Sequence, residues 1–98
     1  MENSVALHLY YIAQEALVNA AKHGHATNVG VELQPAGKRW ALSIRDDGKG
    51  FSTSFVPRTG MGIRIMHYRA RVIGATLDLK SEIGSGTQVA CLFSPAGR

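Results

Sequence analysis

The order in which the hydrophobic periodicity changes along the chain constrains the fold more than any other feature. A segment of helical period is followed by two segments that alternate with period two, and the same order returns after a loop rich in Gly, Ser, Thr and Pro. The expected elements are a helix at Val5–His23, strands at Thr27–Leu33 and Trp40–Ile44, a loop at Asp46–Thr59, a helix from Met61 or Gly62 to Ile73, and strands at Ala75–Lys80 and Thr87–Phe93. Strand pairs separated by helices predict an α+β two-layer sandwich, with the helices on one face of a mostly antiparallel sheet.

Residues that start or stop regular structure stand between these segments. The expected boundaries are a cap at Asn3 or Ser4, a helix end at Gly24, a turn at Pro35–Lys38, a helix end at Gly74 and a turn at Glu82–Gly86. In the first strand, the alternation puts Val29, Val31 and Leu33 on one face.

Composition limits the classes of protein that can show this order of elements. With 98 residues, 45% hydrophobic and 18% charged, the chain is expected to form a single domain over residues 1–98 around one core. The net charge of +4 comes from scattered lysines and arginines, without the basic run of a nucleic-acid-binding tail. No apolar run is long enough to span a bilayer, and no signal peptide is visible. The single cysteine, Cys91, is expected to be a small buried hydrophobe, which fits a reducing cytoplasm.

The first helix carries a polar face opposite its apolar stripe. Glu15 and Asn19 are four residues apart and share this face, with Lys22 and His23 one turn further along. One interpretation is a solvated surface. The other is a binding site, because an amide oxygen together with substrate phosphates often holds Mg²⁺, and a carboxylate one turn away can orient or deprotonate an attacking group.

The stretch "DDGKGF" (Asp46–Phe51) follows directly after a strand. A calcium loop is excluded, because the acids are adjacent rather than alternating and no Glu closes the loop at the proper distance. A hairpin turn and one wall of a nucleotide pocket both remain open. In the nucleotide reading, Asp46 accepts the adenine amino hydrogen, and Gly48 and Gly50 let the backbone approach a flat ring. Asp47 is interpreted as a loop residue that fixes the turn.

The stretch "TGMGI" begins the second helix, and it combines free backbone amides with the positive end of a helix dipole. Gly60 and Gly62 therefore suit a phosphate chain, although a lone GxG is weak evidence. Neither the Walker pattern nor the dinucleotide fingerprint is present.

Four stretches in fixed order carry a family resemblance: "EALVNAAKH", "DDGKGF", "GMGIRIMHYRARVIGA" and "GSGTQV". Together they resemble the ATP-binding catalytic domain of bacterial two-component sensor histidine kinases, within the GHKL ATPase superfamily. The helix text is most similar to the subfamily of nitrate-response and membrane-fluidity sensor kinases. The resemblance implies a mixed, mostly antiparallel sheet, ATP and Mg²⁺ as cofactors, and transfer of the γ-phosphoryl group to a histidine.

The resemblance also assigns roles to residues. At the phosphates, Glu15 takes a catalytic position near the γ-phosphate, Asn19 is the magnesium ligand, and Lys22 and His23 face the phosphates or ribose. At the base, Asp46 reads adenine, Gly48 and Gly50 lie beneath the ring, and Thr87 holds the adenine edge. The second glycine box consists of Gly60, Met61 and Gly62. The segment between Gly50 and Gly60 is short, which implies a small ATP lid. Arg58 in this segment is interpreted as a solvated charge in preference to a phosphate contact.

No phosphoacceptor is visible, because the four histidines, His8, His23, His25 and His67, all fall within the elements of the ATP-binding domain. The early strand that usually precedes the first helix in the family is also missing. The chain is therefore expected to be a fragment that binds ATP without autophosphorylating. Its expected partners are ATP, the dimerisation and phosphoacceptor helical domain of the same protein and, indirectly, a response regulator. No nucleic acid and no direct membrane contact are expected, and the domain is placed in the cytoplasm, in a full protein that can be membrane-anchored.

Three other functions are compatible with parts of this pattern. An anti-sigma-factor serine kinase of the same superfamily has a similar first helix. A basic nucleic-acid-binding domain would use the positive charge, but it leaves Glu15, Asp46 and the glycine pairs without a role. A degenerate domain that binds partners without nucleotide is disfavoured by the intact motifs.

Overall fold

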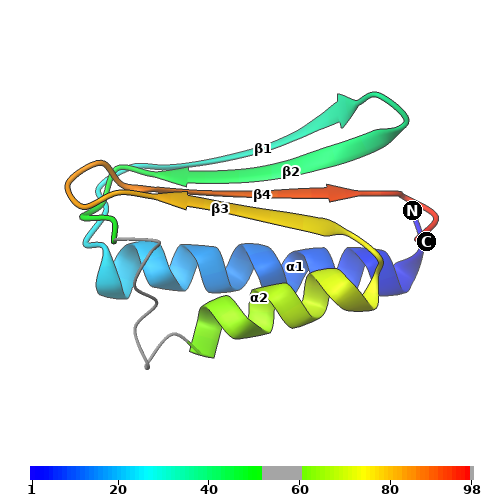
Figure 1. Ribbon diagram of the computed structural model, residues 1–98, viewed down its shortest axis with the longest axis horizontal. Coiled ribbons are helices and arrows are strands. Elements are labelled where there is room, and N and C mark those ends of the chain that lie inside the picture. Colours follow the sequence, from blue (N-terminus) through cyan, green and yellow to red (C-terminus); the bar gives the residue numbers. More distant parts are fainter. Residues whose placement is uncertain (52–60, 98) are drawn as a thin grey trace.

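The computed structural model describes residues 1–51 and 61–97, with the side chain of Met61 left out. Its elements are α1 (Asn3–Val18), a π-helical turn η1 (Asn19–His23), β1 (Val29–Ala36), β2 (Arg39–Asp46), α2 (Met61–Val72), β3 (Thr76–Ser81) and β4 (Thr87–Phe93). Two helices lie side by side under one face of a four-stranded sheet (Figure 1). The predicted α+β two-layer sandwich is thus confirmed. Most of the expected loop, with Arg58 and Gly60, lies outside the described residues.

The strand order β1-β2-β4-β3 puts the two hairpins side by side in the sheet. All three strand pairs within the described residues are antiparallel. The contact between β2 and β4 joins segments far apart in the sequence and sets Asp46 directly opposite Thr87. This register decides the layout of the site, because directly opposed residues of an antiparallel pair project from the same face.

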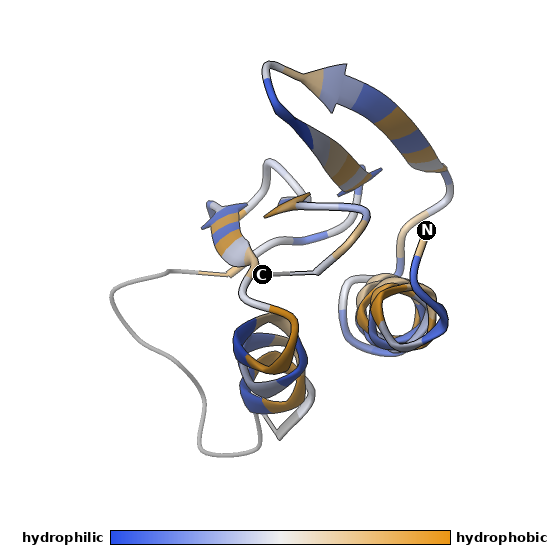
Figure 2. Cartoon of the chain, turned by 90° about the vertical axis from the view of Figure 1, so that its right-hand side faces the viewer, coloured by the Kyte–Doolittle hydropathy of each residue, from blue (hydrophilic) through white to orange (hydrophobic). Residues whose placement is uncertain are grey.

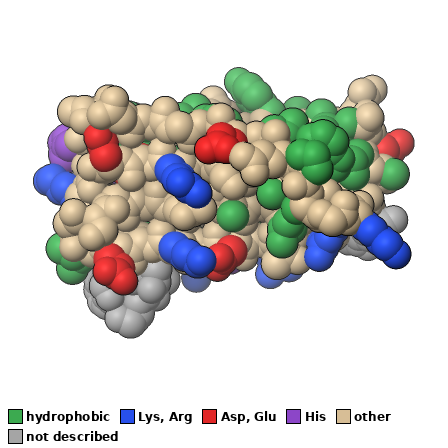
Figure 3. All heavy atoms as spheres, turned by 90° about the horizontal axis from the view of Figure 1, so that it is seen from above, with side chains coloured by type: hydrophobic (Ala, Val, Ile, Leu, Met, Phe, Trp, Pro, Cys, Tyr) green, Lys and Arg blue, Asp and Glu red, His purple; other side chains and the backbone are tan. Residues whose placement is uncertain are grey.

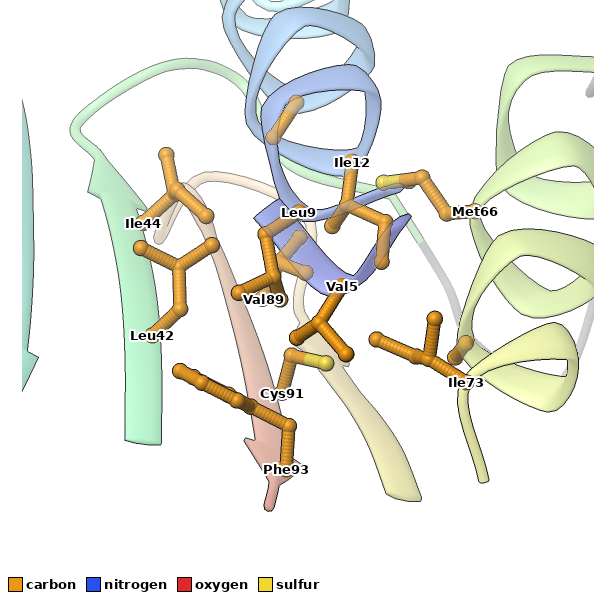
Figure 4. Packing of buried hydrophobic residues seen from close by; sticks show 12 residues of the cluster. Val5, Leu9, Ile12, Leu42, Ile44, Met66, Ile73, Val89, Cys91 and Phe93 are labelled. Carbon is orange, nitrogen blue, oxygen red and sulfur yellow. The ribbon is translucent and has the colours of Figure 1, made fainter. Parts of the chain in front are cut away.

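The hydrophobic core lies between the helices and β2, β4 and β3 (Figure 4). Its fully buried members include Val5, Ile12, Ile44, Met66 and Phe93, so the alternation of the strands and the period of the helices converge on one cluster. Cys91 is also fully buried, as expected, and burial raises the pKa of its thiol to about 11.

The inner face of the edge strand β1 is left uncovered. Val31 and Leu33 lie opposite the buried Ile44 and Leu42, so the expected shared face is present. Both are nevertheless exposed. The β1–β2 ribbon rises away from the helix layer in the end-on view (Figure 2).

The start of α1 and the turn after β1 differ from the sequence expectations. Glu2 occupies the N-cap position of α1 without a side-chain hydrogen bond, so the expected cap at Asn3 or Ser4 is wrong. Pro35 lies within β1, paired with Trp40, and the turn is confined to the two residues that follow Ala36. An edge strand tolerates proline because its free N–H side needs no ladder partner.

The first helix does not continue as a regular α-helix to His23. It widens into the π turn at Asn19, and Gly24 ends this turn with an ordinary φ of −89°. The left-handed conformation falls on His25, at φ 51°. The second helix ends as predicted at Gly74, whose φ is 67°, with the 6→1 and 5→2 hydrogen bonds of a Schellman motif from Ala75 and Gly74.

Candidate functional site

A cavity of about 370 Å³ opens between the helix layer and the sheet, at the end where α1 passes into η1. That volume is typical of a site for a small molecule. The predicted site residues that line it are Glu15, Asn19, Lys22, His23, Asp46, Gly50, Gly62 and Thr87. They come from α1, η1, β2, the loop after β2, α2 and β4, so the fold brings together residues that the sequence could only propose one motif at a time.

The first turn of α2 lies against the polar face of α1. A Cβ added at Gly62 would lie 2.7 Å from Glu15 Oε2 and 3.3 Å from Asn19 Oδ1. The carboxylate and the amide therefore meet at the N-terminus of α2, where backbone N–H groups and the helix dipole favour an anion. Any side chain at position 62 would fill the space between them.

The π turn η1 supplies three residues of this wall. The Gly24 N–H donates to the Asn19 carbonyl at 2.9 Å, which closes a turn one residue wider than that of an α-helix. Both Lys22 and His23 line the cavity together with Asn19. Two cationic or ionisable groups thus follow the amide along one wall, as suits a chain of phosphates.

Asp46 and Thr87 line the cavity from the sheet. They face each other across β2 and β4. The Gly48 N–H donates to Asp46 Oδ1 at 2.8 Å, which holds the carboxylate in place. Oδ2 has no partner among the described residues and can accept a hydrogen bond from a ligand. This arrangement can read a group that presents a hydrogen-bond donor, such as an exocyclic amine.

The apolar part of the cavity was missed by sequence reasoning. It is formed by core side chains of the sheet and of α2, namely Ile44, Ile63, Met66, Leu79 and Val89. In the sequence these residues carry only the ordinary signal of strand and helix cores, because the same side chains serve both the core and the cavity wall. A flat apolar ring fits against such a surface.

The glycines of "DDGKGF" allow loops to pack closely. A Cβ at Gly50, whose φ is 66°, would lie 2.0 Å from the Glu82 carbonyl oxygen. A Cβ at Gly48 would lie 2.7 Å from the Gly24 carbonyl oxygen. Both glycines are therefore required by backbone packing alone. Gly50 also lines the cavity, whereas Gly48 is buried beside the η1 end.

The backbone of Lys49 ties two other loops to this segment. Its N–H donates to the Gly24 carbonyl oxygen at 2.8 Å, and its carbonyl oxygen accepts from the Gly84 N–H at 2.5 Å. The Lys49 side chain is exposed, so its contribution to the site comes from its main chain. Sequence analysis could not show this, because backbone hydrogen bonds between loops leave no residue signature.

Two of the predicted site residues lie wholly or partly outside the described part of the chain. Gly60 lies outside the described residues, and Met61 begins α2 without a described side chain. Within residues 1–51 and 61–97, no group of three or more His, Cys, Asp or Glu side chains could hold a metal ion by itself. The helices in the same ranges are too short or too polar to cross a bilayer.

Comparison with known proteins gives a consistent result. The profile of the family described as histidine kinase-, DNA gyrase B- and HSP90-like ATPase matches residues 4–97. The sensor protein VraS of Staphylococcus aureus is 39% identical over 82 residues, which is 84% of this chain and 24% of VraS. The chain thus spans about a quarter of the length of this relative.

Solved structures share the fold. The histidine kinase domain of the blue-light activated histidine kinase of Erythrobacter litoralis has a TM-score of 0.74 and 22% identity, over 95% of this chain and 48% of that one. The ATP-binding domain of PrrB from Mycobacterium tuberculosis has a TM-score of 0.72 and 23% identity, over 94% and 68%.

Proposed function

The chain belongs to the family of histidine kinase-, DNA gyrase B- and HSP90-like ATPases, and from this membership we propose that it is the Mg²⁺–ATP-binding domain of a sensor histidine kinase. The observation that carries the proposal is the layout of one cavity. Glu15 and Asn19 meet the first turn of α2 on the helix side, and Asp46 and Thr87 lie paired on the sheet side. This layout fits a triphosphate joined to an adenine.

The donors at the α2 end suit magnesium. Asn19 offers an amide oxygen, and the phosphates of a bound nucleotide would supply further oxygens, so a cluster of protein carboxylates is not required. When bound, the ion would neutralise negative charge on the phosphates. Glu15 lies beside Asn19 and can orient the imidazole that attacks the γ-phosphate.

In the whole protein, the phosphoryl acceptor would be a histidine on a separate dimerisation helix domain, and a response regulator would receive the group afterwards. VraS, the 39%-identical relative, is a sensor protein, which supports this setting. The second-helix stretch "GMGIRIMHYRARVIGA" supports the subfamily of nitrate-response and membrane-fluidity sensors. Use of ATP, together with a buried single thiol, supports a cytoplasmic position for this domain.

Calorimetric titration with ATP, GTP and a non-hydrolysable ATP analogue, each with and without Mg²⁺, tests the proposal. The chain should prefer ATP to GTP, because guanine presents an acceptor where Asp46 also accepts. Asp46→Asn should weaken ATP binding about 10- to 100-fold, the effect of losing a charged hydrogen bond, and should shift the preference toward GTP. Asn19→Asp should change the dependence on Mg²⁺ more than the affinity without it.

Matched variants separate these effects from general damage. Asp78→Asn makes the same chemical change on β3, where the side chain is 62% exposed, and it should leave ATP affinity unchanged. Asn3→Asp is the matched control for Asn19→Asp. An Asp46→Asn variant that binds ATP as tightly as the parent chain would show that the adenine assignment is wrong.

A further inference from the structure

Ser81 is a buried hydroxyl that joins three segments behind the adenine end of the cavity. It is the last residue of β3 and lies opposite Thr87 in the β3–β4 hairpin. Its exposed fraction is 8%, and among the described residues it is the one polar residue that the fold buries. A buried polar group carries a free-energy cost unless it is hydrogen-bonded, so its partners explain its presence.

Three groups lie within hydrogen-bond distance of Ser81 Oγ. The Phe51 N–H donates to it at 2.8 Å, the Gly86 carbonyl oxygen lies at 3.1 Å, and Thr87 Oγ1 lies at 2.8 Å. A serine hydroxyl has one hydrogen and two lone pairs, so it can satisfy all three partners at once. It does so by accepting from Phe51 and Thr87 while donating to Gly86.

A second proton arrangement uses the same atoms. Ser81 can give its hydrogen to Thr87 Oγ1 instead of to Gly86, while it still accepts from Phe51. The hydrogen of Thr87 is then free to point into the cavity. Because two hydroxyl oxygens 2.8 Å apart need one hydrogen between them, Thr87 can donate to a ligand only when Ser81 donates to Thr87.

We infer that Ser81 is a positioning residue that fixes the Thr87 hydroxyl and makes it a hydrogen-bond donor beside Asp46. The inference rests on the proposed function. Asp46 accepts from the exocyclic amine of adenine, and the ring nitrogen next to that amine is an acceptor, which needs a donor. Thr87, directly opposite Asp46, supplies this donor once Ser81 gives up its bond to Gly86.

A double-mutant cycle for ATP binding tests the inference. Ser81→Ala should weaken ATP and ADP binding by the same factor, about 5- to 30-fold, because the lost contact is far from the γ-phosphate. In a Thr87→Val background, Ser81→Ala should weaken binding by less than about 2-fold, since Ser81 then has no hydroxyl to position. Ser81→Thr, which keeps the hydroxyl, should bind ATP within about 3-fold of the parent chain.

Two further variants keep the test decisive. Ser43→Ala removes a serine from β2 and should leave ATP affinity unchanged. Ser81→Cys keeps the side-chain shape with a weaker donor, and it replaces Ser81→Ala in the cycle if the alanine variant does not fold. Equal losses in the parent and Thr87→Val backgrounds would overturn the inference, as would unchanged ATP affinity of Ser81→Ala or of the Ser81→Cys variant that replaces it. Failure of the parent chain to bind ATP would instead contradict the proposed function.

Discussion

At the scale of single residues, Asp47 acts on the site without lining it. Its Oδ1 accepts from the N–H groups of Thr27 and Asn28, both at 2.9 Å. Its Oδ2 accepts from the Thr27 hydroxyl at 2.8 Å and from the Asn28 side-chain amide at 2.9 Å. The Asn28 backbone and side chain, followed by the Thr27 hydroxyl, hold the pKa of Asp47 far below its ordinary range. One carboxylate therefore joins the loop after η1 to the loop after β2.

Asp47→Asn should lower the melting temperature at neutral pH by about 5 °C. The new side-chain amide would present hydrogens to the Thr27 hydroxyl and the Asn28 amide, which themselves donate to Asp47 Oδ2 in the parent chain. Since folding lowers the pKa of Asp47, its stabilising effect is present above the unfolded-state pKa of about 4 and is lost as the pH falls below it. The difference from the parent chain should therefore shrink between pH 5 and 3, as measured by circular dichroism. Asp78→Asn serves as the control, and a difference that stays constant over this range would contradict the assignment.

At the scale of elements, the two helices cover three strands and leave the fourth open. Val89 on β4 and Val31 on β1 both project from the inner face of the sheet, yet Val89 is 3% exposed and Val31 is 52% exposed. The two valines share residue type and face of the sheet. They differ in cover by the helices and in strand position, because β1 is the edge strand and β4 lies between β2 and β3.

Val89→Ala should destabilise the chain by about 2–3 kcal/mol, because it opens space in the core. Val31→Ala should cost less than about 1 kcal/mol, the range of strand propensity without burial. Urea unfolding followed by Trp40 fluorescence and by circular dichroism measures both. A Val31→Ala loss as large as that of Val89→Ala would show that the face of β1 is covered in solution.

The helices, the strands and their order were predictable because each has its own period and turn residues. The π turn was not, because Asn19–His23 reads as the continuation of an amphipathic helix. Likewise, Asp46 and Thr87 carried motif signals, but their pairing depends on the β2–β4 register. Ser81 and the Lys49 backbone act through contacts between loops, which no single segment encodes.

At the scale of the whole molecule, charge does not gather into a surface for nucleic acid on the face seen in Figure 3. Basic and acidic side chains are scattered there, while hydrophobic side chains gather toward the end that carries the β1–β2 turn. The net charge of +4 is therefore spread rather than focused on this face.

The positions of the four histidines lead to the last prediction. An acceptor imidazole must stand in line with the phosphoryl bond that breaks. His8 is half-buried, with Nδ1 3.3 Å from Arg69 Nη1, and His25 and His67 are exposed away from the cavity lining. His23 does line the cavity, but the π turn holds it in the binding wall beside Lys22.

The chain incubated with Mg²⁺ and γ-labelled ATP should therefore acquire no acid-labile phosphate, although calorimetry on the same sample shows binding. His23→Gln is the informative control, because His23 alone among the four lies on the described wall of the cavity. Label on the parent chain that disappears in His23→Gln would show that this wall residue reaches the γ-phosphate in line. Label that persists would place the acceptor at another of the histidines, and either result would contradict a domain that binds ATP for a histidine elsewhere.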